Sequence, residues 1–287
     1  MLIRVGLILV LCDGPSVLNG AILEMEHGPL GSGKMYLPCV LDGVEERCVL
    51  DTGSVISLVE NDDRFSKYPA FGSFHFKSAS GISLEADKIQ IRRAQIDKQL
   101  FQNAAFARPS HDHNIESTIG INLIGQKPFW LHFGERASIE LGATAPTSLL
   151  GGIETREDGI FSIPIGLADF KTQAVWDTAA ELTAVDKNYV TKNPENFSAM
   201  RQQAYAKDGT AQPVESKLFK AKKILVGGRT FRNVTVLAVD LSSLHQDKGE
   251  GIHAVIGFNI IRGADWFFDV PNKKWNIKRT VIQQRRR

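Results

Sequence analysis

The segment Cys48-Val-Leu-Asp51-Thr-Gly-Ser54-Val-Ile-Ser57-Leu-Val59 runs from an apolar stretch into a carboxylate, a hydroxyl and a glycine. A second segment, Ala174-Val-Trp-Asp177-Thr-Ala-Ala180-Glu-Leu-Thr183-Ala-Val185, repeats this arrangement 126 residues later. In each case an apolar strand would deliver an Asp at its end, and Gly53 would permit close backbone approach and unusual dihedral angles. The two segments therefore predict two related carboxylates in one chain.

Two further matches follow in the same order. Phe101-Gln-Asn103-Ala-Ala-Phe106 matches Phe231-Arg-Asn233-Val-Thr-Val236 at an offset of 130, and Ile119-Gly-Ile-Asn122-Leu-Ile124 matches Ile256-Gly-Phe-Asn259-Ile-Ile261 at 137. A slowly growing offset is what a few loop insertions would produce. The pattern indicates one β module written twice.

Short apolar or alternating runs predict strands, which are separated by turn dipeptides. The runs are 35–41, 47–50, 89–91, 104–107, 137–141, 160–165, 174–176, 223–226, 234–239 and 266–270, and the turn pairs are Asp42-Gly43, Ser80-Gly81, Asp208-Gly209, Gly227-Gly228 and Pro271-Asn272. Helical periodicity is scarce, and residues 193–206 are the best helix candidate. A mainly β fold is therefore expected.

Composition excludes several classes of protein. The 287 residues are 43% hydrophobic and carry a formal net charge of +2, which argues against a disordered chain, a coiled coil and a nucleic-acid-binding protein. Three cysteines are too few to staple a small disulfide scaffold. Gly28 to Met35 lacks the Ser or Thr that a phosphate-binding loop needs after Lys34.

The N-terminus resembles a short secretory signal peptide. Arg4 precedes an apolar run from Val5 to Cys12, and small residues follow as far as Ala21. Residues 1–21 are therefore expected to be a signal peptide of a secreted, periplasmic or cell-envelope protein. A cytoplasmic location follows instead if the segment is a first strand, and retention of the apolar run would give weak membrane or envelope association. Whether residues 22–34 form a removable pro-segment or an ordered strand is left open.

The two Asp segments and their downstream partners resemble the retropepsin-like branch of the aspartic proteases. The family pattern is Asp-Thr/Ser-Gly after an apolar pair, followed later by an apolar-apolar-Gly segment. Asp51-Thr-Gly with Thr118-Ile-Gly120 supplies it in the first half, and Asp177-Thr-Ala with Val255-Ile-Gly257 in the second. The resemblance covers roughly residues 34–280 and implies a two-lobed acid-protease-like β-barrel fold with an internal pseudo-twofold duplication. The lobes are expected at 22–150 and 151–287.

The resemblance also assigns roles. Asp51 and Asp177 would be the catalytic pair, supported in their loops by Thr52, Gly53, Ser54, Thr178 and Ala179. Hairpin flaps over the substrate would include Ser80, Gly81 and Ile82 in the first half and Gly209 in the second. Ala179 departs from the family pattern, because Gly53 stands at the matching position. That departure leaves open a catalytically inactive peptide-binding module.

The resulting hypothesis is an aspartic endopeptidase that hydrolyses peptide or protein substrates as a monomer. Two adjacent carboxylates share one proton, so the ionised group can activate water while the protonated one donates to a carbonyl oxygen. No cofactor or metal is expected, and His111-Asp-His113 is interpreted as a solvated loop.

Cys39 and Cys48 flank the turn at Asp42-Gly43. A hairpin centred there would pair residue 39 with residue 46 and make the two thiols diagonal neighbours. A disulfide is possible after export but would need a register shift, so two reduced or partly buried thiols are favoured.

Overall fold

The computed structural model describes residues 20–77, 83–110, 115–202, 206–207, 213–214, 216–245 and 251–279. Strands make up 56% of the structure and helices 10%, so the expected mainly β fold is confirmed. The predicted flap residues Ser80, Gly81, Ile82 and Gly209 lie outside the described residues, as do residues 1–19 of the predicted signal peptide. Among the described residues, no helix has the length and apolar character needed to cross a membrane.

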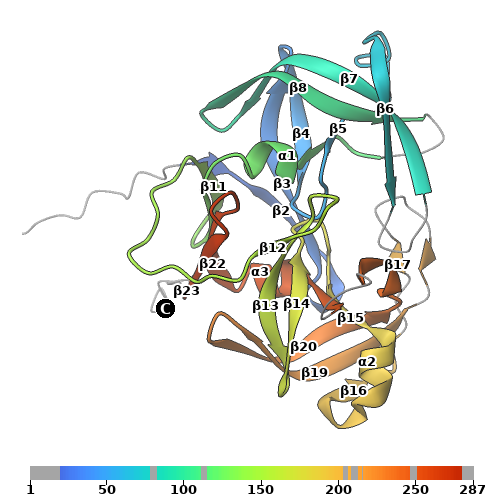
Figure 1. Ribbon diagram of the computed structural model, residues 1–287, viewed down its shortest axis with the longest axis vertical. Helices are drawn as coiled ribbons and strands as arrows, with labels where there is room; N and C mark the ends of the chain where they lie inside the picture. The colour runs from blue at the N-terminus through green and yellow to red at the C-terminus, as the bar shows by residue number, and fades with distance from the viewer. Residues whose placement is uncertain are drawn as a thin grey trace, which may run out of the picture.

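The first half of the chain forms an eight-stranded sheet (Figure 1). Its strands are β2 (Glu24–His27), β3 (Gly33–Leu41), β4 (Val44–Asp51), β5 (Ser57–Leu58), β6 (Ala70–Lys77), β7 (Ser83–Ile96), β8 (Gln99–Pro109) and β9 (Thr118–Gly120). Their order is β2-β3-β4-β9-β5-β8-β7-β6, and a pairing between β3 and β7 closes six of them into a β-barrel.

A second eight-stranded sheet follows the same order of connections. Its strands are β12 (Glu154–Thr155), β13 (Phe161–Leu167), β14 (Phe170–Trp176), β15 (Thr183–Asp186), β16 (Phe197–Ala199), β19 (Lys217–Val226), β20 (Arg229–Val239) and β21 (Ile252–Ile256). They lie in the order β12-β13-β14-β21-β15-β20-β19-β16, with β13 also paired to β19. A separate two-stranded sheet joins β17 (Ala206–Lys207) to β18 (Pro213–Val214).

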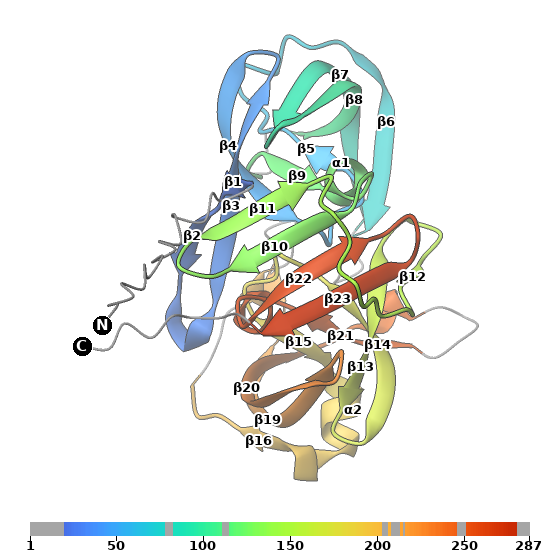
Figure 2. The same ribbon diagram turned by 90° about the vertical axis from the view of Figure 1, so that its left-hand side faces the viewer.

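A five-stranded sheet combines strands from the beginning, the middle and the end of the chain. It consists of β1 (Ala21–Ile22), β10 (Phe129–Phe133), β11 (Ala137–Leu141), β22 (Ala264–Asp269) and β23 (Lys274–Arg279), in the order β1-β11-β10-β22-β23. Figure 2 shows this sheet lying between the two eight-stranded ones. Residues 22–34, which the sequence left open as a pro-segment or an ordered strand, contain the end of β1, which pairs with β11, and all of β2, which pairs with β3.

The helices are short. The α-helices are α1 (Ile121–Ile124), α2 (Lys187–Lys192) and α3 (Phe258–Ile261), and the 3-10 turns are η1 (Pro29–Gly31), η2 (Pro194–Asn196) and η3 (Ser242–Leu244). The helix predicted over 193–206 is wrong. Asn193 ends α2 by donating its side-chain amide to Tyr189 O at 2.8 Å, and Phe197 then enters β16, where its side chain is buried.

Hairpin turns agree with the dipeptides that predict them. Asp42-Gly43 and Gly227-Gly228 all have positive φ, as a tight turn between antiparallel strands requires, and they join β3 to β4 and β19 to β20.

Beneath the strands, Trp176 packs on Phe268 with ring centroids 4.4 Å apart, and Phe268 stacks on Trp275. This aromatic core ties the five-stranded sheet to the end of β14, directly before Asp177.

Candidate active site

Asp51 and Asp177 each lie where a strand meets a loop. Asp51 is the last residue of β4, where it pairs with Gly120 of the parallel strand β9. Asp177 follows β14, and its backbone N–H donates to Ile256 O of β21 at 3.0 Å. Since β4 and β14 occupy matching places in the two eight-stranded sheets, each sheet presents one carboxyl group.

The two Asp side chains are adjacent. Each carboxyl group influences the pKa of the other, and the charge of Asp177 raises the pKa of Asp51. Oδ1 of Asp177 also accepts from the backbone N–H of Ala179 at 2.8 Å and of Ala180 at 3.1 Å. Oδ1 of Asp51 is buried and has no hydrogen-bond partner within the protein.

Burial is the largest cause of a raised pKa at both residues. The pKa of Asp51 lies well above its usual range because burial disfavours its anion and because the Asp177 charge repels it. Burial also raises the pKa of Asp177, against the opposing effect of the N–H groups of Ala179 and Ala180. The pair therefore retains a proton at a pH where isolated carboxyls have lost theirs.

Thr52 and Thr178 lock the two loops together. Thr52 N–H donates to Thr178 Oγ1 at 3.0 Å, and Thr178 N–H donates to Thr52 Oγ1 at 3.1 Å. Each hydroxyl then donates across the junction, Thr52 to Trp176 O at 2.7 Å and Thr178 to Leu50 O at 2.6 Å. Both threonines are fully buried, so the reciprocal bonds hold the backbone on either side of the carboxyl pair.

Thr178→Val should lower the free energy of unfolding by about 2–4 kcal/mol, because it leaves Leu50 O and Thr52 N–H buried without their partner. Urea unfolding followed by tryptophan fluorescence measures the loss. Thr178→Ser keeps the hydroxyl and should recover most of it. Equal losses in the two variants would show that the methyl group and not the hydroxyl carries the effect.

Position 53 requires glycine because its backbone lies close to the carboxyl group of Asp177. A Cβ built on Gly53 would lie 2.5 Å from Cγ of Asp177, which is closer than carbon atoms approach. Its φ is not in the left-handed region, so the unusual backbone dihedral expected from the sequence is not what requires glycine here. The matching residue, Ala179, also has a negative φ and uses its N–H on Asp177. Its methyl group is therefore compatible with the loop conformation.

Side-chain hydrogen bonds hold each Asp loop against the segment after the apolar-apolar-Gly motif. Gly120 N–H donates to Ser57 Oγ at 2.9 Å, and Ser57 donates to Asn122 Oδ1 at 2.8 Å. Thr183 and Asn259 make the same contact at 2.8 Å in the second sheet. Sequence reasoning missed this role, although the internal matches align Ser57 with Thr183 and Asn122 with Asn259.

Ser54, the remaining predicted support residue, donates its hydroxyl to Ile56 O at 2.7 Å and accepts Ile121 N–H at its carbonyl at 2.9 Å. It therefore shapes the turn that follows Asp51 and joins it to α1. Ala180 O accepts Phe258 N–H in the same manner, at 2.8 Å.

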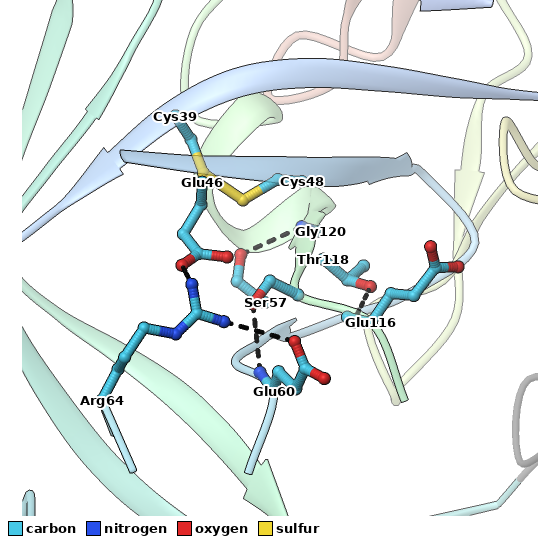
Figure 3. Close-up of a disulfide and its surroundings, with 10 residues drawn as sticks. Cys39, Glu46, Cys48, Ser57, Glu60, Arg64, Glu116, Thr118 and Gly120 are labelled. Carbon is cyan, nitrogen blue, oxygen red and sulfur yellow. Dashed lines mark hydrogen bonds and ion pairs between the residues drawn. A yellow bond between two sulfur atoms is a disulfide. The ribbon is translucent and has the colours of Figure 1, made fainter. Parts of the chain in front are cut away.

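A disulfide joins Cys39 to Cys48, three residues before Asp51 (Figure 3). The expectation of two free thiols is wrong, although the expected register is right, with Cys39 opposite Glu46 and Leu37 opposite Cys48. The diagonal Cα atoms are only 6.3 Å apart, within the range that a disulfide spans, so no register shift is needed. The bond ties β4 to β3 directly before the carboxyl pair.

A pocket of about 450 Å³ begins beside the first loop. Val55 and Ile56 form its wall next to the loop, Phe74 of β6 lines a second side, and Asp158 and Gly159 come from the second half of the chain. The two carboxyl groups are not among its lining residues. The pocket lies alongside the Asp51 loop and is lined mainly by apolar atoms.

No cluster of three or more His, Cys, Asp or Glu side chains arranged to hold a metal ion occurs in the described part of the chain. The predicted loop at His111 to His113 lies outside it. A scan against protein-family models matches none, and a search of curated proteins finds no match to this chain.

Proposed function

We propose that this protein is an aspartic endopeptidase that hydrolyses peptide bonds with water activated between Asp51 and Asp177. The observation that carries the proposal is the adjacent pair of buried carboxyl groups, one from each eight-stranded sheet, whose pKa values are raised by burial and, at Asp51, by the charge of Asp177. Structural ion pairs place a cation beside a carboxylate, whereas here a second carboxyl group takes that place. Such an arrangement is costly for folding and useful for acid–base chemistry.

The repeated strand order supports a two-lobed fold produced by internal duplication, with lobes near 22–150 and 151–287. Further support comes from matching backbone conformations: Asn103 and Asn233, aligned by the sequence repeats, have φ of 52° and 53°. Asparagine tolerates this left-handed region better than most residues. The paired threonines then lie on the pseudo-twofold axis, in agreement with the resemblance to the retropepsin-like proteases.

The proposed reaction needs no group beyond the pair and a water molecule. Ionised Asp177 takes a proton from water as the hydroxyl oxygen bonds to the peptide carbonyl carbon, and Asp51 gives its proton to the carbonyl oxygen. Asp177 then protonates the amide nitrogen while Asp51 takes a proton from one hydroxyl of the tetrahedral intermediate, and the C–N bond breaks. A carboxylic acid and an amine leave, and both Asp residues return to their starting states.

The test is digestion of a diverse peptide mixture by the purified chain of residues 22–287, beside its Asp51→Asn variant, between pH 3 and 8 with mass-spectrometric detection. Cleavage by the parent alone supports the proposal and defines the preferred sequences. Silence of both proteins, together with retained peptide binding, would favour the peptide-binding module that the methyl group of Ala179 raises as the alternative.

The rate should follow a bell-shaped pH profile. Activity requires ionised Asp177 and protonated Asp51, so it should rise with pH through the pKa of Asp177 and fall through that of Asp51. Because both pKa values are raised from 3.8, both limbs and the optimum should lie above pH 3.8. The measurement is kcat/KM for one cleaved peptide from pH 3 to 9. A rate that climbs steadily to pH 9 would exclude the shared-proton mechanism.

A further inference from the structure

A second pocket, of about 530 Å³, opens next to the 450 Å³ pocket on the first eight-stranded sheet. Its wall is formed by residues 99–105 of β8, by α1 and the residues after it, and by Lys88 of β7. The two pockets share Ile56, Phe74 and Asn122. The shared residues make the two pockets neighbouring parts of one groove, and Val55 and Ile56, which follow the Asp51 loop, line its first part.

The second pocket is here called the lysine groove, because its charged lining residues are all lysines. Lys88 and Lys127 line it with the amides of Gln99, Gln102, Asn103 and Gln126, and no Asp or Glu is among its lining residues. Amide N–H groups and ammonium groups are hydrogen-bond donors that suit carboxylates. The apolar pocket beside it differs in character, so the two parts of the groove would select different side chains.

Neither lysine is neutralised by an ion pair within the described residues. Lys88 Nζ lies over two aromatic rings, 5.2 Å from the centroid of Phe71 and 5.1 Å from that of Phe74. Lys127 donates to the neutral Gln99 Oε1 at 2.5 Å. By contrast, nearby Arg108 is paired with Asp87 at 2.6 Å. Two positive charges therefore face the groove with only neutral partners.

We propose that the lysine groove binds an acidic segment of the peptide substrate, several residues away from the bond that is cleaved. The proposal rests on the proposed function for the identity of the ligand, and on charge complementarity and the continuity of the groove for its location. Glu or Asp side chains would accept from Lys88 and Lys127, and the amides would bond to the peptide backbone. The protein would thereby favour substrates with an acidic stretch several residues from the cleavage site.

Binding is measured without turnover, on the chain of residues 22–287 carrying Asp177→Asn. The probe is a fluorescein-labelled peptide with four consecutive Glu residues, compared by anisotropy with the same peptide carrying Gln in their place. We expect the Glu peptide to bind more tightly, and Lys88→Gln with Lys127→Gln to weaken its binding about five- to tenfold without affecting the Gln peptide. Raising the salt concentration should weaken binding of the Glu peptide alone.

Lys222→Gln, an exposed lysine on β19 of the second sheet, is the matched control and should leave both affinities unchanged. Equal affinity for the two peptides, or an equal loss in the control, would overturn the proposal. Tighter binding of single-stranded oligothymidylate than of the Glu peptide would overturn it as well, because the groove would then serve a nucleic acid.

The active chain supplies a separate readout. For a cleaved peptide extended by a Glu-rich segment, the double lysine variant should raise KM about five- to tenfold with kcat unchanged, and the neutral version should be unaffected. Preferential binding of the Glu peptide without any cleavage would refute the protease proposal and support the proposed role of the lysine groove. Cleavage at the same rate with and without the acidic segment would support the protease proposal and refute the role of the lysine groove.

Discussion

Replacing either Asp51 or Asp177 with Asn is expected to lower kcat/KM for a cleaved peptide by about 10³-fold or more. Each carboxyl group transfers a proton in both halves of the proposed reaction, and Asn can neither take the proton from water nor give one to the carbonyl oxygen. Because the two groups act as one unit, the double variant should be no slower than either single one. Steady-state kinetics at the pH optimum of the parent measure all three.

The control is the stability of the variants. The folded-state pKa of Asp51 is raised, so the native protein keeps a proton that the unfolded chain releases above its ordinary pKa of 3.8. The unfolding free energy therefore falls as pH rises through that window, and Asp51→Asn removes this loss. At pH 7 the variant should have an unfolding midpoint at least equal to that of the parent. Full activity in either single variant would reject the paired-carboxylate mechanism.

Gly53→Ala is expected to reduce kcat/KM by about 10²-fold or more while the protein still folds. The new Cβ would lie 2.5 Å from Cγ and 2.6 Å from Oδ2 of Asp177, so that carboxyl group must move by roughly an ångström, and misplacement on this scale costs about two orders of magnitude. Loss of the shared proton should accompany the movement, and the pH profile should change with it.

Ala179→Gly is the matched change in the other loop. It removes a methyl group from a residue with negative φ that already positions its N–H on Asp177 Oδ1, so activity should stay within about threefold of the parent and stability should fall by about 0.5–1 kcal/mol. Equal effects of Gly53→Ala and Ala179→Gly would show that the two loops do not differ in the way their geometry implies. A large gain with Ala179→Gly would identify the methyl group as an obstacle to catalysis.

Local patterns along the chain predict much of the fold. Alternation and turn dipeptides place β3, β4, β11 and the turns at Asp42 and Gly227 within a few residues, because strand period and left-handed turn positions depend on neighbouring residues alone. The helix expected over 193–206 fails for a complementary reason. The pairing of Phe197 with Ala221, 24 residues later along the chain, outweighs a weak local preference.

The amino-acid sequence by itself determined that this is a mainly β protein, that two Asp segments and their downstream partners recur in order, and that Asp51 and Asp177 are the residues to examine. Only the tertiary structure decided that the two carboxyl groups are buried beside each other, that Gly53 is needed for contact across the junction, that Cys39 reaches Cys48 on the diagonal, and that Lys88 and Lys127 line one groove. The physical reason is the distance along the chain over which the interactions act. Strand patterns and turns depend on steric preferences over a few residues, whereas pKa values, close approaches and grooves depend on groups from distant segments, such as Thr52 and Thr178, which are 126 residues apart.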